Sequence, residues 1–337
     1  MTTLLIGCYT EPMEHVNGHG EGIAVADFNG QITVRHVLAM RNPSWLTFDA
    51  TRQVLFAVSE VDIRGEGEVV AFRRDGAGHF HEISRCGTGG SYPAHAAIDP
   101  DTGTLVVANY GTGSVATFQL IDERLQARDV VAHSGASIDP VRQLGPHTHQ
   151  ALFDPRVRQL LVPDLGTDTI ERYRVGPAGE LSHRGSVQAR PGSGPRHGLF
   201  TSAGEQLLVL NELDSTIDRY DRDGENFVRG HCTTMRPDDY HGRNLAAALR
   251  MTGTGLVLAS NRGLDAVALV RPQDPDHVRL IPSGGKEPRD LVASPDERFV
   301  LVANQDSDVV SVFTLSGADL QVHSAADVPS PACLLFI

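Results

Sequence analysis

Four side chains of kinds that accept protons or bind anions occupy corresponding positions in a sequence repeat of this chain. They are His149, Arg196, Glu212 and Arg262. An imidazole or a carboxylate can serve as a general base, and guanidinium groups bind oxyanions through charge-assisted hydrogen bonds. Burying such groups is costly unless they are paired or used, and polar groups that converge on a cavity indicate a binding site. Because two arginines exceed what one glutamate needs, we interpret the four as a functional site rather than as an ion-pair ring that locks neighbouring repeats.

The repeat that relates these residues has the pattern of β-propeller blades. Each copy begins with an anchor residue, usually Pro, followed by a short strand in which polar and apolar residues alternate. An apolar strand that ends in an Asn-like residue comes next. A third strand rich in residues with high β-propensity and a polar fourth strand complete the copy. The anchors of six copies, 44 to 55 residues apart, are Pro43, Pro93, Thr148, Pro195, Asn244 and Pro288. A period of this size with β-type alternation is typical of propellers.

The two ends of the chain supply a seventh copy. Residues 1–40 contain three strand-like runs without a leading inner strand, and PACLLFI at the other end looks like that missing strand. The sequence therefore predicts an all-β fold, a seven-bladed β-propeller closed by pairing of the N- and C-terminal strands, with residues 1–337 as a single domain. The period persists over the whole length, which argues against a β-sandwich.

Two columns of the repeat change chemical character between copies. The column just after the anchor reads Ser44, Ala94, His149, Arg196, Leu245 and Arg289. The column just after the Asn-like residue reads Val61, Tyr110, Leu165, Glu212, Arg262 and Gln305. If equivalent columns lie at equivalent heights, the four catalytic candidates converge on one sector of the central channel. We expect the substrate-binding residues to be His147, Tyr110, Arg289, Gln305 and the only lysine, Lys286.

Other patterns favour structural roles. The Asn-like column consists of Glu60, Asn109, Asp164, Asn211, Asn261 and Asn304, whose oxygen atoms suit calcium. Its presence in every copy favours a turn or a cap of the blade instead. His147 and His149 share one face of a strand, but no third ligand lies at a zinc-like spacing. We interpret His95 as a channel-lining or hydrogen-bonded histidine, and we expect no metal and no other cofactor.

The composition restricts partners and location. A formal net charge of −13 argues against binding to nucleic acid or to a membrane surface, and an anionic small molecule would need a local basic pocket. The four cysteines, Cys8, Cys86, Cys232 and Cys333, are far apart and form no CxxC pair. The first residues do not resemble a signal peptide, and no segment reaches the roughly 18 apolar residues of a membrane span. We expect a cytoplasmic protein with free thiols, and the oligomeric state stays open.

A series of motifs extends in order over nearly the full length. It comprises GCYT, NPSWL, NYGTGSV, GPHTHQALFDP, PDLGTD, GSGPRHGLF, NELDSTI, ASNRG and ANQDSDVVSVF. Through these motifs the chain resembles the propeller lactonase family, which includes 6-phosphogluconolactonases of the cycloisomerase type and carboxymuconate lactonizing enzymes. The family's active-site set of a His, an Arg, a Glu and a second Arg falls on His149, Arg196, Glu212 and Arg262. Cys8, where the family usually has Thr, and the weakly matching GIAVADFN depart from the pattern in the split blade.

The resemblance implies a lactone hydrolase, above all a 6-phosphogluconolactonase of the pentose phosphate pathway that converts 6-phospho-D-glucono-1,5-lactone to 6-phosphogluconate. Glu212 or His149 would activate water. One of Arg196 and Arg262 would face the oxyanion while the other binds phosphate, and Arg289 with Lys286 would extend the phosphate pocket.

Three alternatives stay open. A cycloisomerase acting on carboxymuconate would use the same arginines for carboxylates. A non-enzymatic propeller scaffold would expose large apolar or aromatic patches to protein partners. A calcium-dependent lactonase would lose its activity when a chelator is added.

Overall fold

The structure is a computed structural model, and it describes residues 2–63, 66–201 and 203–337. In these ranges the backbone forms β-strands and one short 3-10 helix, η1 (Gln305–Ser307), without any α-helix. Seven of the sheets in the described ranges have four strands each. The fold is a seven-bladed β-propeller, as predicted. None of the described residues belongs to a helix long and apolar enough to cross a membrane.

The chain forms two compact units. The first comprises Met1–Asn42, Leu199–Asp221 and Arg229–Ile337, and the second comprises Pro43–Gly198 and Arg222–Val228. The assignment of residues 1–337 to a single domain stays a prediction.

The first unit contains three complete blades. The split blade has the order β30-β1-β4-β5 and consists of β1 (Thr2–Cys8), β4 (Gly22–Phe28), β5 (Ile32–Ala39) and β30 (Pro331–Phe336). A hairpin of β2 (Pro12–Met13) and β3 (Val16–Asn17) lies between β1 and β4 in the sequence. The next blade consists of β22 (Leu245–Met251), β23 (Val257–Arg262), β24 (Ala266–Arg271) and β25 (Asp274–Pro282). The last consists of β26 (Pro288–Ala293), β27 (Phe299–Asn304), β28 (Val309–Ser316) and β29 (Asp319–Asp327).

The second unit contains three further complete blades. The first has β6 (Pro43–Asp49), β7 (Val54–Ile63), β8 (Glu66–Arg74) and β9 (Phe80–Gly87). The second has β10 (Pro93–Ile98), β11 (Leu105–Asn109), β12 (Ser114–Ile121) and β13 (Arg124–Ala132). The third has β14 (Leu152–Phe153), β15 (Leu160–Asp164), β16 (Thr169–Val175) and β17 (Leu181–Gln188). The remaining four-stranded sheet consists of β18 (Pro195–Phe200), β19 (Gln206–Asn211), β20 (Thr216–Asp223) and β21 (Asn226–Thr234).

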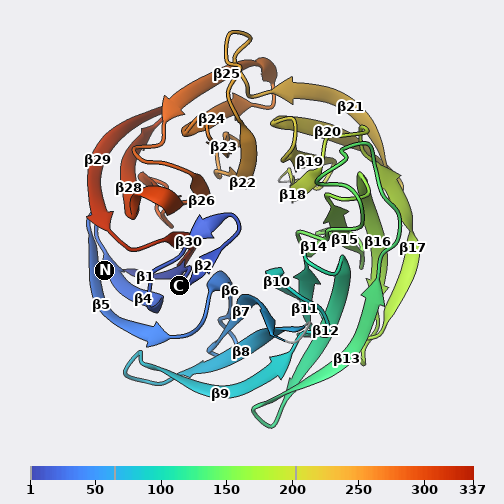
Figure 1. The fold of residues 1–337 in the computed structure, drawn as a ribbon, viewed down its shortest axis with the longest axis vertical. Helices are drawn as coiled ribbons and strands as arrows, with labels where there is room; N and C mark the ends of the chain where they lie inside the picture. Colours follow the sequence, from blue (N-terminus) through green and yellow to red (C-terminus); the bar gives the residue numbers. More distant parts are fainter. Residues whose placement is uncertain (1, 64–65, 202) are drawn as a thin grey trace. The chain divides into compact units, whose positions relative to one another are not determined.

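The split blade joins the two ends of the chain. Strand β1 pairs antiparallel with β30, from Leu4 opposite Phe336 to Cys8 opposite Pro331, and it pairs with β4 on its other side. Figure 1 shows both chain ends in this blade. The pairing leaves β1 without an unpaired edge, which would otherwise be open to association with other chains. The predicted closure by the terminal strands is therefore confirmed.

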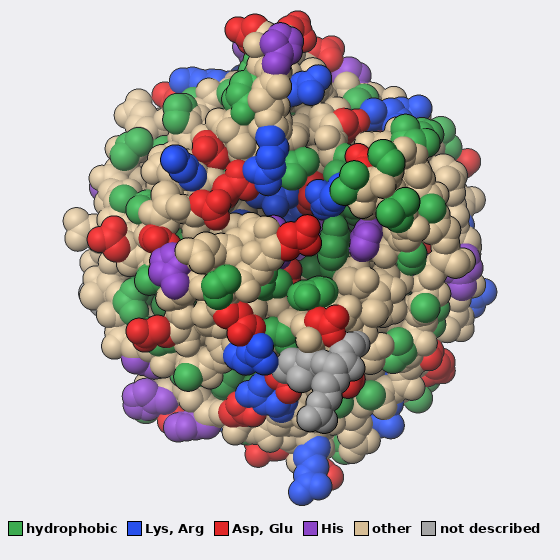
Figure 2. Space-filling model, viewed as in Figure 1, with side chains coloured by type: hydrophobic (Ala, Val, Ile, Leu, Met, Phe, Trp, Pro, Cys, Tyr) green, Lys and Arg blue, Asp and Glu red, His purple; other side chains and the backbone are tan. Residues whose placement is uncertain are grey.

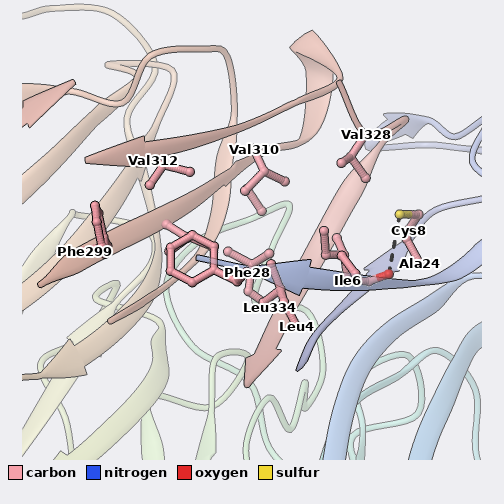
Figure 3. Close-up of a cluster of buried hydrophobic side chains, with 13 residues drawn as sticks. Leu4, Ile6, Cys8, Ala24, Phe28, Phe299, Val310, Val312, Val328 and Leu334 are labelled. Carbon is pink, nitrogen blue, oxygen red and sulfur yellow. Dashed lines mark hydrogen bonds between the residues drawn. The ribbon is translucent and has the colours of Figure 1, made fainter. Parts of the chain in front are cut away.

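The second and fourth strands of a blade differ in burial. All six residues of β27 are buried, whereas the outer strand β29 has one buried residue and otherwise consists of half-buried and exposed positions. A strand covered on both faces takes a continuous apolar sequence, and a polar outer edge discourages further pairing. Leu4, Phe28, Val312 and Leu334 belong to one buried cluster of the first unit (Figure 3). Burial in this cluster raises the pKa of the Cys8 thiol to about 12, so Cys8 stays protonated and serves as a core residue.

The first strand of each blade is its inner strand. The side chain two residues after an anchor forms a hydrogen bond to the backbone of the inner strand of the next blade. The pairs are Trp45 Nε1 with Ala96 O (3.1 Å), Ala151 N with His95 Nδ1 (3.4 Å), Gly198 N with Gln150 Oε1 (2.6 Å) and Leu334 N with Asp290 Oδ2 (2.9 Å). We call these bonds the inner-strand links. Each link satisfies a buried polar group and holds one inner strand in register with the next.

Aspartates in the left-handed conformation hold the residue that precedes an inner strand. They are Asp168 (φ 53°), Asp265 (φ 54°) and Asp308 (φ 57°). Their Oδ1 atoms accept the backbone N–H groups of Gly194 (2.7 Å), Glu287 (2.8 Å) and Ser330 (2.8 Å) respectively. Aspartate tolerates this conformation better than most residues and accepts such local hydrogen bonds. The start of an inner strand, where site residues were predicted, is therefore fixed by side-chain hydrogen bonds.

We expect the closure of the split blade to depend on the packing of β30. Leu334→Ala should lower the free energy of unfolding by about 2 to 5 kcal/mol, because it opens a cavity in the buried cluster around a side chain that is 3% exposed. Urea unfolding followed by circular dichroism measures this change. The matched control is Leu144→Ala at a side chain that is 77% exposed, which should change stability by less than about 0.5 kcal/mol. Equal effects of the two substitutions would contradict the packing described for β30.

Candidate active site

The column just after the anchor coincides with a repeated β-bulge. In β26 the pairing passes from Pro288 opposite Asn304 to Asp290 opposite Ala303, so Arg289 has no partner across the ladder. Strands β6 and β10 skip the corresponding residue in the same way. An extra residue in a strand is left out of the ladder and its side chain is re-aimed. The bulge therefore gives this column a direction different from that of its strand neighbours.

His149 lies in the second unit, where the inner strand of its blade is interrupted. Only Leu152–Phe153 pairs as β14, and Thr148 forms an isolated bridge to Asp164. Asp164 Oδ1 accepts the backbone N–H of His147 at 2.7 Å, and the His149 N–H donates to Pro163 O at 3.0 Å, so this segment is held by a side chain as well as by backbone hydrogen bonds. The His149 side chain is thus presented by an irregular segment, and it is buried.

Tyr110 contacts both predicted histidines of the second unit. The ring of His147 stacks on it, with centroids 4.6 Å apart and planes at 18°, and His147 Nδ1 lies 2.9 Å from the Tyr110 carbonyl oxygen. His149 meets the Tyr110 ring edge-on at 5.5 Å. Arg142 Nη2 donates to the Tyr110 hydroxyl at 3.0 Å. The structure therefore groups three predicted site residues, and Arg142 adds a cation to them.

Arg196 is buried in β18 and lies against the next residue of the chain. Its Nη1 is 3.2 Å from His197 Nε2. A guanidinium has only donors, so Nε2 accepts this hydrogen bond and the neutral His197 carries its proton on Nδ1. The His197 ring also meets the His149 ring edge-on at 5.3 Å. Arg196 and His149 thus both contact His197, which the sequence analysis did not single out.

Trp45 and His95 complete the aromatic surroundings of His197. Trp45 lies 4.2 Å from His95 and 5.5 Å from His197, centroid to centroid. All three occupy the column two residues after the anchor, together with Gln150 and Asp290. The residue type in this column changes from one copy to the next, so the sequence contains a signal that could have identified His197. His95 takes part in an inner-strand link, which agrees with its interpretation as a hydrogen-bonded histidine.

In the first unit, Glu212 and Arg262 form a buried ion pair. Glu212 directly follows β19, and Arg262 is the last residue of β23. Arg262 Nη2 lies 3.0 Å from Glu212 Oε2, and the Arg262 and Glu212 side chains are 7% and 5% exposed. Arg262 Nη2 also lies 3.4 Å from Ala246 O, and the Ala246 N–H donates to Glu212 O at 3.2 Å. A backbone residue of β22 therefore contacts both partners.

The pairing between β22 and β23 continues as far as Arg262, and other arginines lie near its side chain. Arg262 pairs across the strands with Leu245, one position beyond Asn261, the Asn-like residue of its blade. Burial lowers its pKa, Glu212 opposes this effect, and the positive charges of Arg289 and Arg243 lower the pKa further. Figure 2 shows basic side chains beside acidic ones over β22, β23 and β26. The pair Glu212–Arg262 thus lies among additional guanidinium groups that favour an anion.

The predicted substrate-binding residues of the last blade are only partly brought together. Arg289 Nη1 donates to Gln305 Oε1 at 3.3 Å, so these two meet as predicted. Arg243 Nη1 pairs with Glu287 Oε1 at 2.6 Å. The side chain of Lys286 is exposed, and within the described ranges it forms no ion pair; its backbone N–H donates to the Ser307 hydroxyl at 2.9 Å.

The Asn-like column carries structural hydrogen bonds. Asn304 Nδ2 donates to Ser283 O at 3.2 Å and to Ser311 Oγ at 3.0 Å. Asn109 Nδ2 makes the corresponding bonds to Thr88 O and to a serine hydroxyl. Both amides are fully buried. Each ties the end of the second strand to the third strand of its own blade and to the residue that follows the fourth strand of the preceding blade. This supports the interpretation of the column as a structural cap.

In the described part of the chain, no group of three or more His, Cys, Asp or Glu side chains is placed to hold a metal ion. None of the four cysteines forms a disulfide bond, and Cys8 and Cys333 are buried.

Known proteins resemble this chain over its whole length. The family model described as Lactonase, 7-bladed beta-propeller matches residues 3–336. The 6-phosphogluconolactonase of Bacillus subtilis (strain 168) is 27% identical over 309 residues, which is 88% of this chain and 87% of that protein. The structure described as a periplasmic gluconolactonase of Pseudomonas aeruginosa has 31% identity and a TM-score of 0.89, with 100% of this chain and 99% of that chain covered. A putative 6-phosphogluconolactonase of Bacteroides fragilis has 26% identity and a TM-score of 0.89, with 100% and 98% covered.

Both the sequence and the fold therefore point to one family of enzymes that open lactones. By its match over residues 3–336, the chain belongs to the seven-bladed β-propeller lactonase family.

Proposed function

We propose that this protein hydrolyses 6-phospho-D-glucono-1,5-lactone to 6-phosphogluconate, a step of the pentose phosphate pathway, with His149, Arg196, Glu212 and Arg262 as its catalytic groups. The observation that carries the proposal is the buried pair of Glu212 and Arg262 among further arginines. The members of the family named above act on lactones, and the names of two of them include 6-phosphogluconolactonase.

A second observation favours function over a purely structural role for these residues. Successive inner strands are held by the inner-strand links, which use the column two residues after the anchor. Arg289 lies in the neighbouring column, which the β-bulge leaves out of the ladder. A buried ion pair contributes little net stability, because removing two charges from water offsets their attraction. The cost of burying Glu212 and Arg262 among further arginines is better explained by a ligand than by a gain in stability.

The chemistry requires one activated water and two anion contacts. Glu212 or His149 removes a proton from water, and the water oxygen attacks the lactone carbonyl carbon. A guanidinium of Arg196 or Arg262 stabilises the oxyanion that forms, and the other arginine binds the phosphate, with Arg289 beside it. The ring carbon–oxygen bond then breaks, the ring oxygen takes the proton back from the base, and the product acid ionises. A lactone is reactive, so this assistance is sufficient without a metal.

We expect Glu212→Gln and His149→Ala each to lower kcat by about 10²- to 10⁴-fold, because each removes a candidate for the general base. Gln keeps the shape of the side chain and can still accept a hydrogen bond from Arg262. Hydrolysis is measured with 6-phosphogluconolactone, and folding is checked by circular dichroism.

The controls are Glu123→Gln, which changes an exposed carboxylate paired with Arg73, and His183→Ala, which changes an exposed imidazole paired with Glu171. Both controls should retain activity. Full activity of both Glu212→Gln and His149→Ala would rule out the assignment, and loss in only one identifies the base.

A substrate panel separates this function from its alternatives. We expect hydrolysis of 6-phosphogluconolactone to exceed that of glucono-1,5-lactone, no reaction with carboxymuconate, and unchanged rates in EDTA, because guanidinium groups supply the positive charge. Rates are measured for each compound with and without the chelator. Activity that EDTA abolishes and calcium restores would point to the calcium-dependent enzyme, and turnover of carboxymuconate would point to the cycloisomerase.

We also propose a cytoplasmic location. None of the four cysteines forms a disulfide bond, which supports a reducing compartment. The Pseudomonas aeruginosa relative is described as periplasmic, so cell fractionation with an antibody is the direct test. Recovery of the protein from the periplasm would overturn this proposal and leave the enzymatic one unaffected.

A further inference from the structure

The loop between β1 and β4 departs from the repeat at the position where site residues occur. In the blades of β11 and β15, only residues 110–113 and 165–168 separate the second strand from the third. In the split blade, residues 9–21 occupy this connection and form the β2–β3 hairpin. Tyr9 directly follows β1, as Tyr110 follows β11, so Tyr9 is the split-blade member of the column that holds Glu212 and Gln305. An insertion at this position can add residues to a site.

The β2–β3 hairpin is held in place by packing and hydrogen bonds within the first unit. Tyr9 is fully buried and packs with Val16 and Ala332. The backbone N–H of Thr10 donates to Asn42 Oδ1 at 2.8 Å, and Gly20 N donates to Tyr9 O at 2.7 Å. Interactions of this kind on both arms of the hairpin fix the position of the residues at its tip.

The tip of the hairpin carries an exposed histidine, His15, beside predicted substrate-binding residues. The His15 ring meets the Tyr9 ring edge-on at 5.4 Å, and its Nε2 lies 3.4 Å from the Tyr9 hydroxyl. The guanidinium of Arg289 lies over the same Tyr9 ring, 4.9 Å from its centroid. Gln305 joins the two, since its Oε1 accepts from Arg289 and its Nε2 donates to the His15 carbonyl oxygen at 3.3 Å. Tyr9 and Gln305 therefore hold an imidazole and a guanidinium near each other.

We propose that the β2–β3 hairpin completes a subsite for the phosphate group of the substrate, in which His15 and Arg289 bind the phosphate oxygens and Tyr9 and Gln305 position them. This inference rests on the proposed function, and it names the residues that decide between phosphorylated and unphosphorylated lactones. An imidazole N–H and a guanidinium are both good donors to phosphate oxygens, and charge-assisted hydrogen bonds are the strongest available for this purpose. A glucono-1,5-lactone without phosphate presents only a neutral hydroxyl at this end.

The test compares two lactones and two histidines of the same hairpin region. His15→Ala should raise the KM for 6-phosphogluconolactone about tenfold, with kcat changed by less than about twofold, and leave both constants for glucono-1,5-lactone unchanged. His15→Arg restores a hydrogen-bond donor at this position and should recover most of the preference. The matched control is His19→Ala, an exposed histidine that pairs with Asp308 instead, and it should behave as the unmodified protein. An unchanged KM for the phosphorylated lactone, or equal losses on both lactones, would overturn the subsite.

A binding measurement separates this inference from the proposed function. Calorimetry compares 6-phosphogluconate with gluconate on the unmodified protein and on His15→Ala. We expect the unmodified protein to bind the phosphorylated acid more tightly and His15→Ala to lose most of that difference. Failure of the unmodified protein to hydrolyse either lactone would refute the proposed function, whereas equal binding of the two acids would refute the subsite.

Discussion

The hydrogen bond from a side chain of one inner strand to the backbone of the next is the interaction on which the rest of the structure depends. Trp45, Gln150 and Asp290 all make it, although one is an aromatic donor, one an amide and one a carboxylate. Each reaches the residue three positions beyond the next anchor. A buried backbone group without a partner is costly, so these bonds hold successive inner strands in a single register within each unit. Fixed inner strands are a precondition for placing side chains reproducibly at their starting ends.

The links occupy one column, and this leaves the neighbouring column available for chemistry. The β-bulge at the start of β26 leaves Arg289 out of the ladder. Just before this strand, the carboxylate of Asp265 accepts the backbone N–H of Glu287. The scaffold thus presents a side chain on a backbone whose hydrogen bonds are already satisfied. Preorganised donors of this kind are what stabilisation of an oxyanion requires, because no reorganisation is needed during the reaction.

The distribution of charge is compatible with the anionic substrate that we propose for this acidic protein. The chain has a formal net charge of −13, yet Arg243, Arg262 and Arg289 act on one another in the first unit. Two of these arginines pair with Glu212 and Glu287, which moderates the cost of bringing three cations together. The hairpin tip with His15 adds another donor at the same end of the unit. The local field is therefore favourable to a phosphate although the overall field is not.

The sequence by itself determined the blade repeat, the closure by the terminal strands and the two columns that carry His149, Arg289 and Glu212, because alternation and period depend only on the order of residues. The tertiary structure decided which side chains meet. His197 and Trp45 were not predicted, because contacts between side chains of different blades depend on how the folded chain places the inner strands and not on the spacing within one copy. Lys286 lies near Arg289 in the sequence, but its side chain is exposed, and its backbone N–H donates to the Ser307 hydroxyl. The hairpin of residues 9–21 has no counterpart in the other blades, so comparison between copies gave no expectation for His15, and only the folded chain places it beside Tyr9 and Gln305.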